Sequence, residues 1–225
     1  LYSYSFTASD IDSGDTITFT IPVKPSWLSL NTATNTLSGT PTNSDVGLHN
    51  VTITATDSGG LSATQSFRIN VENVNDAPTF TSTAITAATE DVGYSYTPTT
   101  NDIDTGDTVT VSLTRGPSWL ILNAGNLGGI PRNSDVGTHN VVLTATDTGT
   151  LTATQSFTIT VANVNDAPTF DNLLFTYSVA ENQTAITTVA GSDVDEDSLT
   201  IALSGTDAAS FNLSTSNVLT FVDAP

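Results

Sequence analysis

The sequence predicts an all-β fold built from tandem antiparallel β-sandwiches, and three observations carry this prediction. Residues 37–80 return with few changes as residues 127–170, an offset of 90 residues. Segments such as 15–21 and 49–57 alternate small polar and apolar residues with period two, as half-buried strands do. Thr and Val, which favour strands, are abundant throughout. A repeat of this length, with short strands separated by turn signals, implies two sheets packed face to face.

The repeat also sets the expected domain boundaries. The first unit covers residues 1–77 and lacks its opening strand, the second covers 78–167 and is complete, and the third covers 168–225 and is partial. The linker NVNDAPTF follows the last strand of the first two units, and its proline stiffens the junction. We therefore expect the units to stack end to end. Because the chain begins at Leu1 with no leader sequence, we also expect it to be a piece of a longer chain.

The charge balance excludes several classes of function. The chain has 23 Asp and Glu residues against 4 Lys and Arg residues, which gives a formal net charge of −19 at pH 7. Surfaces that bind nucleic acid or anionic membranes need clustered Lys and Arg, so neither partner is expected. No apolar run approaches the roughly 20 residues of a membrane span, so no membrane insertion is expected in this segment. The absence of Cys excludes disulfides and thiolate zinc sites.

Acidic side chains recur at the same places in successive units. The pair Asp10 and Asp12 returns as Asp102 and Asp104, and again as Asp193 and Asp195. Further candidate ligands, in turns, linkers and first strands, are Asp45, Asp57, Asn75, Asp76, Glu90, Asp135, Asp147, Asn165, Asp166 and Glu181. Crowded carboxylates repel one another and need a counter-ion, yet no Lys or Arg recurs beside them. Calcium accepts about six to eight oxygen ligands of these types, so the pattern predicts Ca²⁺ sites.

Other interpretations of single residues stay open. Asp beside Gly and Ser is common in turns, where its side chain bonds local backbone, and Asp15, Asp107 and Asp197 fit such a role. Zinc would need His or Cys, but His49 and His139 are expected to cap turns or lie at the surface. The tryptophans of the two PSWL segments, Trp27 and Trp119, are expected to anchor the core.

Three short motifs, in a fixed order, resemble cadherin repeats. They are ASDID (8–12), ATDSG (55–59) and VNDAPTF (74–80). The segments PSWLSLN, LSGTP, SDVG and HNVTITATD resemble more particularly the dystroglycan-type cadherin-like, Ig-like module of bacterial surface proteins, whereas VAENQTA (179–185) is closer to an ordinary cadherin repeat. The resemblance implies Ig-like, cadherin-like Greek-key sandwiches in a large bacterial surface adhesin.

The resemblance also implies calcium at the junctions between units. Carried over by position, the first junction would use Asp45, Asn75, Asp76, Asp102, Asp104 and Asp147, and the second would use Glu90, Asp135, Asn165, Asp166, Asp193 and Asp195. Asp91 follows Glu90 and is an alternative ligand. Cadherin linkers commonly read D-x-N-D-N, whereas Asn73 and Asn163 replace the first Asp here and the final Asn is absent. Fewer charges imply fewer or weaker ions at each junction.

The sequence therefore predicts an extracellular, calcium-stiffened spacer that projects a distal binding region of an adhesin. Its expected partners are the neighbouring repeats of the same chain, and polysaccharides or surface proteins stay open as further partners. A binding module for carbohydrate or protein is the alternative, with the tyrosines at 2, 4, 94 and 96 as a stacking platform, as is a homophilic fibre. No enzyme is expected, because a catalytic carboxylate pair would normally occur once rather than in every unit.

Overall fold

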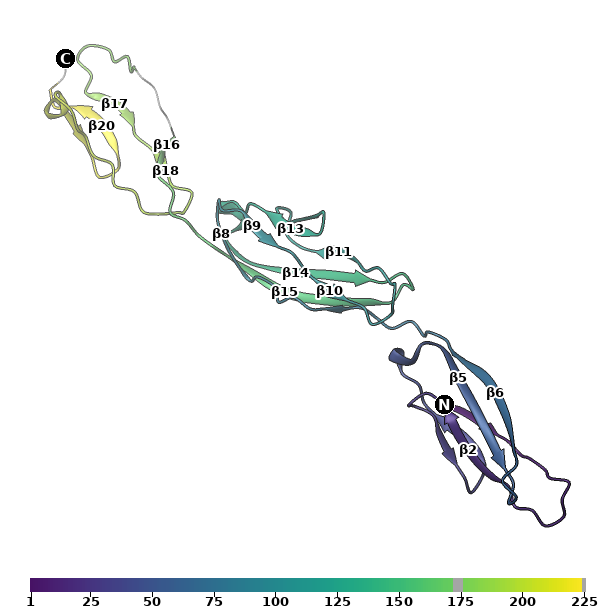
Figure 1. Cartoon of the computed structure of the whole chain (residues 1–225). Coiled ribbons are helices and arrows are strands. Elements are labelled where there is room, and N and C mark those ends of the chain that lie inside the picture. Colours follow the sequence, from purple (N-terminus) through teal and green to yellow (C-terminus); the bar gives the residue numbers. More distant parts are fainter. Residues whose placement is uncertain (172–175, 224–225) are drawn as a thin grey trace. The chain divides into compact units, whose positions relative to one another are not determined.

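The chain folds as predicted into β-strands joined by turns. A computed structural model describes residues 1–171 and 176–223, and within them the only helices are short 3-10 turns (Figure 1). These turns are η1 (Asn43–Asp45), η2 (Asn133–Asp135) and η3 (Ala208–Ser210). The predicted third domain, 168–225, includes residues 172–175 and 224–225, which lie outside the described residues.

The described residues form two compact units by their internal contacts. The first unit combines Leu1–Ser82 with Thr99–Ser112 and Thr144–Thr154. The second combines Thr83–Pro98, Leu113–Leu143 and the chain from Gln155 onward. The first unit therefore contains the first repeat, the linker at 73–78 and the acidic loops of the second repeat. The second unit contains the linker at 163–168 and the acidic loop of the third repeat.

The first repeat is a sandwich of two three-stranded sheets. One sheet has the order β1-β4-β3 and the other has the order β2-β5-β6. Their bounds are β1 (Tyr2–Ser5), β2 (Thr18–Val23), β3 (Ser29–Asn31), β4 (Thr36–Gly39), β5 (Gly47–Thr56) and β6 (Ser62–Val71). Strands β5 and β6 pair antiparallel over ten residues, from Gly47 opposite Val71 to Thr56 opposite Ser62. The period-two alternation of β5 and β6 thus places one face of this long ribbon toward the core, as predicted.

The core of the first repeat lies between these two sheets. Leu37 of β4 and Val51 of β5 are fully buried, and Tyr4 of β1 meets Phe67 of β6 edge to face at 5.4 Å between ring centroids. Trp27 packs against this cluster, which confirms the predicted anchor. A Cβ at Gly39 would collide with the Trp27 carbonyl oxygen, so the close approach of the PSWL segment to β4 requires glycine.

The second repeat keeps the same plan with additional strands. Its sheets have the orders β11-β14-β15-β8, β12-β13-β9 and β10-β7. The bounds are β7 (Thr79–Phe80), β8 (Ala87–Thr89), β9 (Tyr94–Tyr96), β10 (Thr100–Asn101), β11 (Thr110–Arg115), β12 (Ile121–Asn123), β13 (Asn126–Gly129), β14 (Gly137–Thr146) and β15 (Thr152–Ala162). Tyr96 and Phe157 meet edge to face at 5.9 Å between two of these sheets. The shorter β12–β13 turn uses Ala124 and Gly125, both with positive φ, as a two-residue hairpin requires.

The third repeat contributes two small sheets to the second compact unit. Their orders are β16-β18 and β17-β20-β19. The bounds are β16 (Thr169–Phe170), β17 (Ala185–Thr188), β18 (Gly191–Ser192), β19 (Phe211–Leu213) and β20 (Val218–Phe221). Strand β16 pairs with β18 through Thr169 opposite Ser192, which ties the end of the linker to the strand before the acidic loop at 193–197.

Two substitutions in one hairpin test which of its side chains belong to the core. Leu127 is fully buried, whereas Ile121 on the adjacent strand is 63% exposed. We expect Leu127→Ala to lower the free energy of unfolding by about 2–5 kcal/mol, because it leaves a cavity. Ile121→Ala should change it by less than about 0.5 kcal/mol. Urea unfolding followed by tryptophan fluorescence measures both, and equal losses would contradict this placement of the core.

Candidate metal centres

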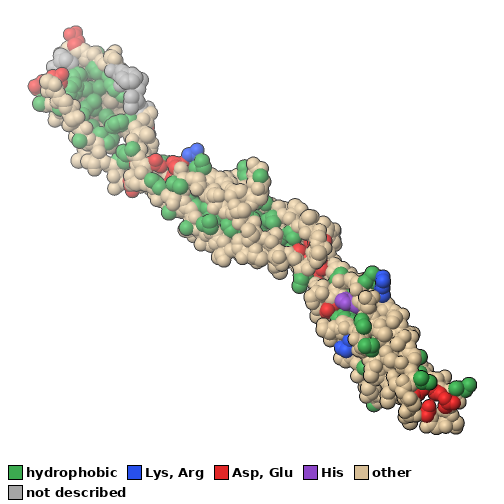
Figure 2. Space-filling view, in the orientation of Figure 1, with side chains coloured by type: hydrophobic (Ala, Val, Ile, Leu, Met, Phe, Trp, Pro, Cys, Tyr) green, Lys and Arg blue, Asp and Glu red, His purple; other side chains and the backbone are tan. Residues whose placement is uncertain are grey.

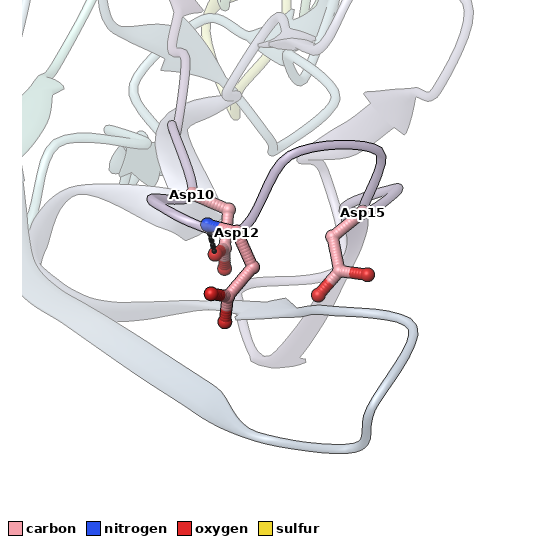
Figure 3. A group of neighbouring side chains, drawn as sticks. All are labelled: Asp10, Asp12 and Asp15. Atoms are coloured by element: carbon pink, nitrogen blue, oxygen red, sulfur yellow. Dashed lines mark hydrogen bonds between the residues drawn. The ribbon is translucent and has the colours of Figure 1, made fainter.

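Three aspartates of the first repeat converge on one side of a loop. One carboxylate oxygen each of Asp10, Asp12 and Asp15 lies within 4.8 Å of the other two, and Figure 3 shows the three side chains on the same side of the loop. The backbone N–H of Asp12 donates to Asp10 Oδ1 at 2.8 Å, and the Ser58 hydroxyl donates to Asp15 Oδ1 at 2.6 Å. All three aspartates are exposed to solvent.

The equivalent loop of the second repeat brings its carboxylates together in the same way, and its aspartates are more buried. Asp102, Asp104 and Asp107 again bring one carboxylate oxygen each within 4.8 Å, and Asp104 is only 5% exposed. The backbone N–H of Asp104 donates to Asp102 Oδ1 at 2.9 Å. The buried atoms Asp102 Oδ2, Asp104 Oδ1 and Asp107 Oδ2 have no hydrogen-bond partner. Buried carboxylate oxygens without donors are costly, and an oxygen-seeking cation fits all three.

The linker after the first repeat closes over this buried loop. The backbone N–H of Asp76 donates to Asp104 Oδ2 at 2.7 Å, and the Asn75 amide donates to Asp147 Oδ2 at 2.9 Å. Asp147 is 6% exposed and its other oxygen accepts the backbone N–H of Leu151. A Cβ at Gly149 would collide with the Asn75 amide, which shows how tightly the linker packs against this turn. The linker and the two acidic loops all belong to the first compact unit.

Five of the six residues predicted for the first junction form hydrogen bonds with one another. Asp76 bonds to Asp104, Asp104 to Asp102, and Asn75 to Asp147. The sixth, Asp45, has a local role. Its Oδ2 accepts the backbone N–H and the hydroxyl of Thr42, both at 2.9 Å, at the start of η1. These two hydrogen bonds, that of the backbone first, lower the pKa of Asp45 from its ordinary value of 3.8. The imidazole Nε2–H of His49 donates to the Asp45 carbonyl oxygen, so this histidine caps the turn.

A second acidic cluster forms in the second compact unit. One carboxylate oxygen each of Glu90, Asp166 and Asp195 lies within 4.8 Å of the others, and Glu90 is 2% exposed. The backbone N–H of Asp166 donates to Asp195 Oδ2 at 2.5 Å, and that of Val164 donates to Glu90 Oε2 at 3.2 Å. The Asn133 amide donates to Asp195 Oδ1 at 2.9 Å. Two linker positions and two loops thus meet at these carboxylates.

The remaining predicted residues of this junction surround the cluster or serve local turns. Asp193 Oδ1 accepts the backbone N–H of Asp195 at 2.9 Å, and the Asn165 amide donates to the carbonyl of its neighbour Asp166. Asp135 Oδ2 accepts the backbone N–H of Arg132 at 2.9 Å, as Asp45 does in the first repeat.

Between the two candidate acids of the first strand, the structure places Glu90 in the cluster. Asp91 instead forms an exposed ion pair with Arg132, with 2.5 Å between the nitrogen and the oxygen. Asp91 also adopts a positive φ of 56°, and its backbone N–H donates to the Pro131 carbonyl oxygen. Arg132 occupies the position that Thr42 has in the first repeat, so only the second of these two repeats has a positively charged side chain at this position.

Asp57 and Glu181 are the remaining two predicted ligands, and neither belongs to an acidic group found among the described residues. Asp57 Oδ1 accepts the backbone N–H of Leu61 at 2.9 Å, and Glu181 is exposed to solvent. The sequence interpretation also missed Asn43, Asn133 and Asp107. Asn43 donates its amide to Asp76, as Asn133 does to Asp195, and Asp107 joins the acidic triad of the second repeat. The repeated tripeptide NSD at 43–45 and 133–135 is the sequence signal that marks these asparagines.

The donors and acceptors of both clusters suit a hard cation. Every side-chain group that meets in the acidic triads is a carboxylate. Figure 2 shows Asp and Glu side chains gathered in a few groups on the visible face, whereas Lys and Arg are sparse. Three groups of described residues could therefore hold a metal ion: Asp10, Asp12 and Asp15; Asp102, Asp104 and Asp107; and Glu90, Asp166 and Asp195.

The chain matches a known protein family over most of its length. Residues 1–72 and 77–162 match the family described as "Putative Ig domain". The "Serine-rich adhesin for platelets" of Staphylococcus aureus (strain USA300) is 32% identical over 166 residues, which cover 72% of this chain but only 7% of that protein. This chain thus spans a small fraction of the length of the curated relatives that it resembles.

Solved structures with a similar fold include cadherin ectodomains. A structure of mouse cadherin-23 EC22–24 has a TM-score of 0.62 and 23% sequence identity, and the match covers 99% of this chain and 81% of that one. Extracellular domains 3–6 of protocadherin gamma B2 have a TM-score of 0.58 and 21% identity, with coverage of 99% and 60%. At these identities the likeness concerns the fold, and it confirms the predicted tandem Ig-like, cadherin-like sandwiches.

The capping role of Asp45 has a consequence for acid stability. Thr42→Val removes the hydroxyl donor and keeps the backbone donor, so the pKa of Asp45 should rise toward 3.8. A carboxyl whose pKa is lowered by folding stabilises the folded state above its ordinary pKa, and this stabilisation is lost as the pH falls through the folded pKa. At pH 5 the variant should therefore be less stable than the parent, and in stronger acid the two stabilities should become equal. NMR titration of the carboxyl measures the shift, with Thr42→Ser as the control. An unchanged pKa in Thr42→Val would contradict the assignment.

Proposed function

Because this chain belongs to that Ig-domain family, we propose that its repeats form an extracellular, calcium-binding segment of a bacterial surface adhesin. The segment acts as a spacer that projects a distal binding region from the cell. Similarity to the staphylococcal adhesin supports the extracellular location and the link to adhesion. Within the described residues, none of the helices is long and apolar enough to cross a bilayer.

One observation carries the calcium proposal. Three buried carboxylate oxygens of the loop at 102–107 lack hydrogen-bond partners. The second oxygen of each of these carboxylates accepts a backbone or side-chain donor. Like charges at this separation repel strongly where water is excluded, and a divalent cation offsets that repulsion. Calcium suits the site better than magnesium, because magnesium binds through one or two carboxylates and retains several waters.

Calcium bound here would act on the linker as well as on the loop. Asn75 and Asp76 are already tied to Asp147 and Asp104. An ion shared by these loops would hold the linker carbonyls and the amide in one arrangement, and would thereby reduce the freedom of the chain at the junction. The cluster of Glu90, Asp166 and Asp195 would do the same for the linker at 163–168. Stiffening of the repeat array is the proposed mechanical result.

The tyrosines considered for carbohydrate stacking favour the spacer over a glycan-binding module. Tyr94 and Tyr96 are 6% and 4% exposed, and Tyr2 and Tyr4 pack against the core of the first repeat. Burial raises the pKa of Tyr94 to about 12, and its hydroxyl donates to the Ile85 carbonyl oxygen. Side chains held in this way do not offer a ring face to a sugar. The neighbouring repeats of the same chain are therefore the proposed partners.

Calcium should stabilise the folded chain. Binding to the folded state alone adds about 2.7 kcal/mol of unfolding free energy at one hundred times the dissociation constant. We expect millimolar Ca²⁺ to raise the melting temperature relative to a chelator, and Asp104→Asn to abolish much of this rise. Scanning calorimetry with Ca²⁺, Mg²⁺ and chelator measures the effect, with Asp207→Asn as an exposed control outside the clusters. Identical melting curves in Ca²⁺ and in chelator would contradict the calcium proposal.

The spacer role makes a separate prediction about shape and binding. Small-angle scattering should show a narrower distribution of interatomic distances near the maximum in Ca²⁺ than in chelator, because ordered linkers restrict the repeats. Asp76→Ala, at the linker itself, should broaden the distribution in Ca²⁺. A glycan array and an analytical ultracentrifugation run in Ca²⁺ test the alternatives. Specific glycan binding would favour the binding module, and concentration-dependent assembly would favour the homophilic fibre.

A further inference from the structure

We propose that Asp107 is a third carboxylate ligand of the cation held by the loop at 102–107, and that the Thr148 hydroxyl sets its position. This inference rests on the proposed calcium binding and deepens it. The repeated acidic pair accounts for Asp102 and Asp104, whereas position 107 fits a simple turn residue by its sequence alone. The structure assigns it to the metal site through its contacts.

The two oxygens of the Asp107 carboxylate have different surroundings. Oδ1 accepts the Thr148 hydroxyl at 2.7 Å. Oδ2 is buried and has no hydrogen-bond partner, and the carboxylate contributes an oxygen to the triad within 4.8 Å. Asp104 belongs to the same triad, is only 5% exposed, and also has a buried Oδ1 without a hydrogen-bond partner. Buried oxygens of this kind are stable only with a donor or a cation, and the donors present already serve the opposite oxygens.

The carboxylate of Asp107 is not needed to close the turn. The backbone N–H of Asp107 donates to the Asp104 carbonyl oxygen at 3.2 Å, so the main chain forms the turn by itself. A side chain used only for the turn would bond to local backbone. Instead, Oδ1 reaches a hydroxyl 41 residues away on the turn after β14. The side chain therefore connects two acidic loops rather than stabilising one.

Thr148 lies beside another carboxylate of the junction. It follows Asp147, which receives the linker amide of Asn75. One turn thus presents Asp147 to the linker and, through the hydroxyl of Thr148, orients Asp107 toward the ion. Hydrogen bonds that orient a metal ligand typically affect metal affinity by about 10- to 100-fold.

The first repeat contains the same arrangement with a different hydroxyl. Ser58 donates to Asp15 Oδ1 at 2.6 Å, and the backbone N–H of Asp15 donates to the Asp12 carbonyl oxygen. Asp15 also joins its two neighbours in a triad of the same size. The relation between the third aspartate and a Ser or Thr hydroxyl therefore occurs twice in this chain. The geometry depends on the hydroxyl and not on the methyl group of threonine.

Titration calorimetry of the whole chain with Ca²⁺ tests the role of Asp107. Asp107→Asn should weaken one class of sites by about tenfold or more, because a charge and a preferred ligand are lost. In chelator the variant should be as stable as the parent or more stable, since a repelling charge is gone. Asp207→Asn removes an equal charge from an exposed position and should leave the affinity unchanged. An unaltered affinity in Asp107→Asn, or an equal loss of stability with and without Ca²⁺, would overturn the proposal.

The positioning role of Thr148 has its own pair of variants. Thr148→Val should weaken the same class of sites, by less than Asp107→Asn does, whereas Thr148→Ser should restore the parent affinity, as Ser58 supplies the hydroxyl in the first repeat. Equal affinities in Thr148→Val and the parent would refute the positioning role. If the parent chain itself binds no Ca²⁺, the proposed function and this inference fail together. If the parent binds and Asp107→Asn binds equally well, only the inference fails.

Discussion

The mutual repulsion of closely spaced carboxylates is the constraint on which the junctions of this chain depend. In the loop at 102–107, one oxygen from each of three carboxylates lies within 4.8 Å of the others; Asp104 is buried, and Asp102 and Asp107 are half-buried. Backbone donors from Asp76 and Asp104 satisfy part of this charge, but each donor reaches only one oxygen of its partner. The oxygens that remain define a site whose repulsion a bound cation would offset, which is the basis of the proposed calcium binding.

The sandwiches provide the rigidity that holds these carboxylates together. Asp147 follows the last residue of β14, whose Val141 and Leu143 are buried in the core. Trp119 meets Tyr94 and His139 edge to face, and a side chain at Gly129 would collide with the tryptophan backbone. Because the core and the strand register are determined by such contacts, the loops at the strand ends cannot easily separate to relieve their repulsion. The energy of packing thereby maintains a charge density that an isolated loop would avoid.

Sequence reasoning predicted the fold and the acidic pairs, since both follow from periodicity and repetition. It did not foresee local interactions that compete with distant ones. Asp45 was predicted as a ligand, and in the structure its Oδ2 accepts the two donors of Thr42 and caps its own turn. The choice between Glu90 and Asp91 depends on a positive φ and an ion pair with Arg132. Spacing along the chain does not reveal such contacts, nor that Asn43 lies against the linker.

The two acidic loops of the first compact unit show what the linker contributes. The loops at 10–15 and 102–107 share their residue pattern, their triad and a hydroxyl partner, yet the aspartates of the first are exposed and those of the second are partly or fully buried. The difference is the presence of Asn75 and Asp76 over the second loop. Desolvation strengthens the attraction between carboxylates and a cation, so the linker should convert a weak surface site into a tighter one. Under the proposed function, cation affinity would belong to a repeat and its preceding linker together, and ion binding would be coupled to the order of the chain at that linker.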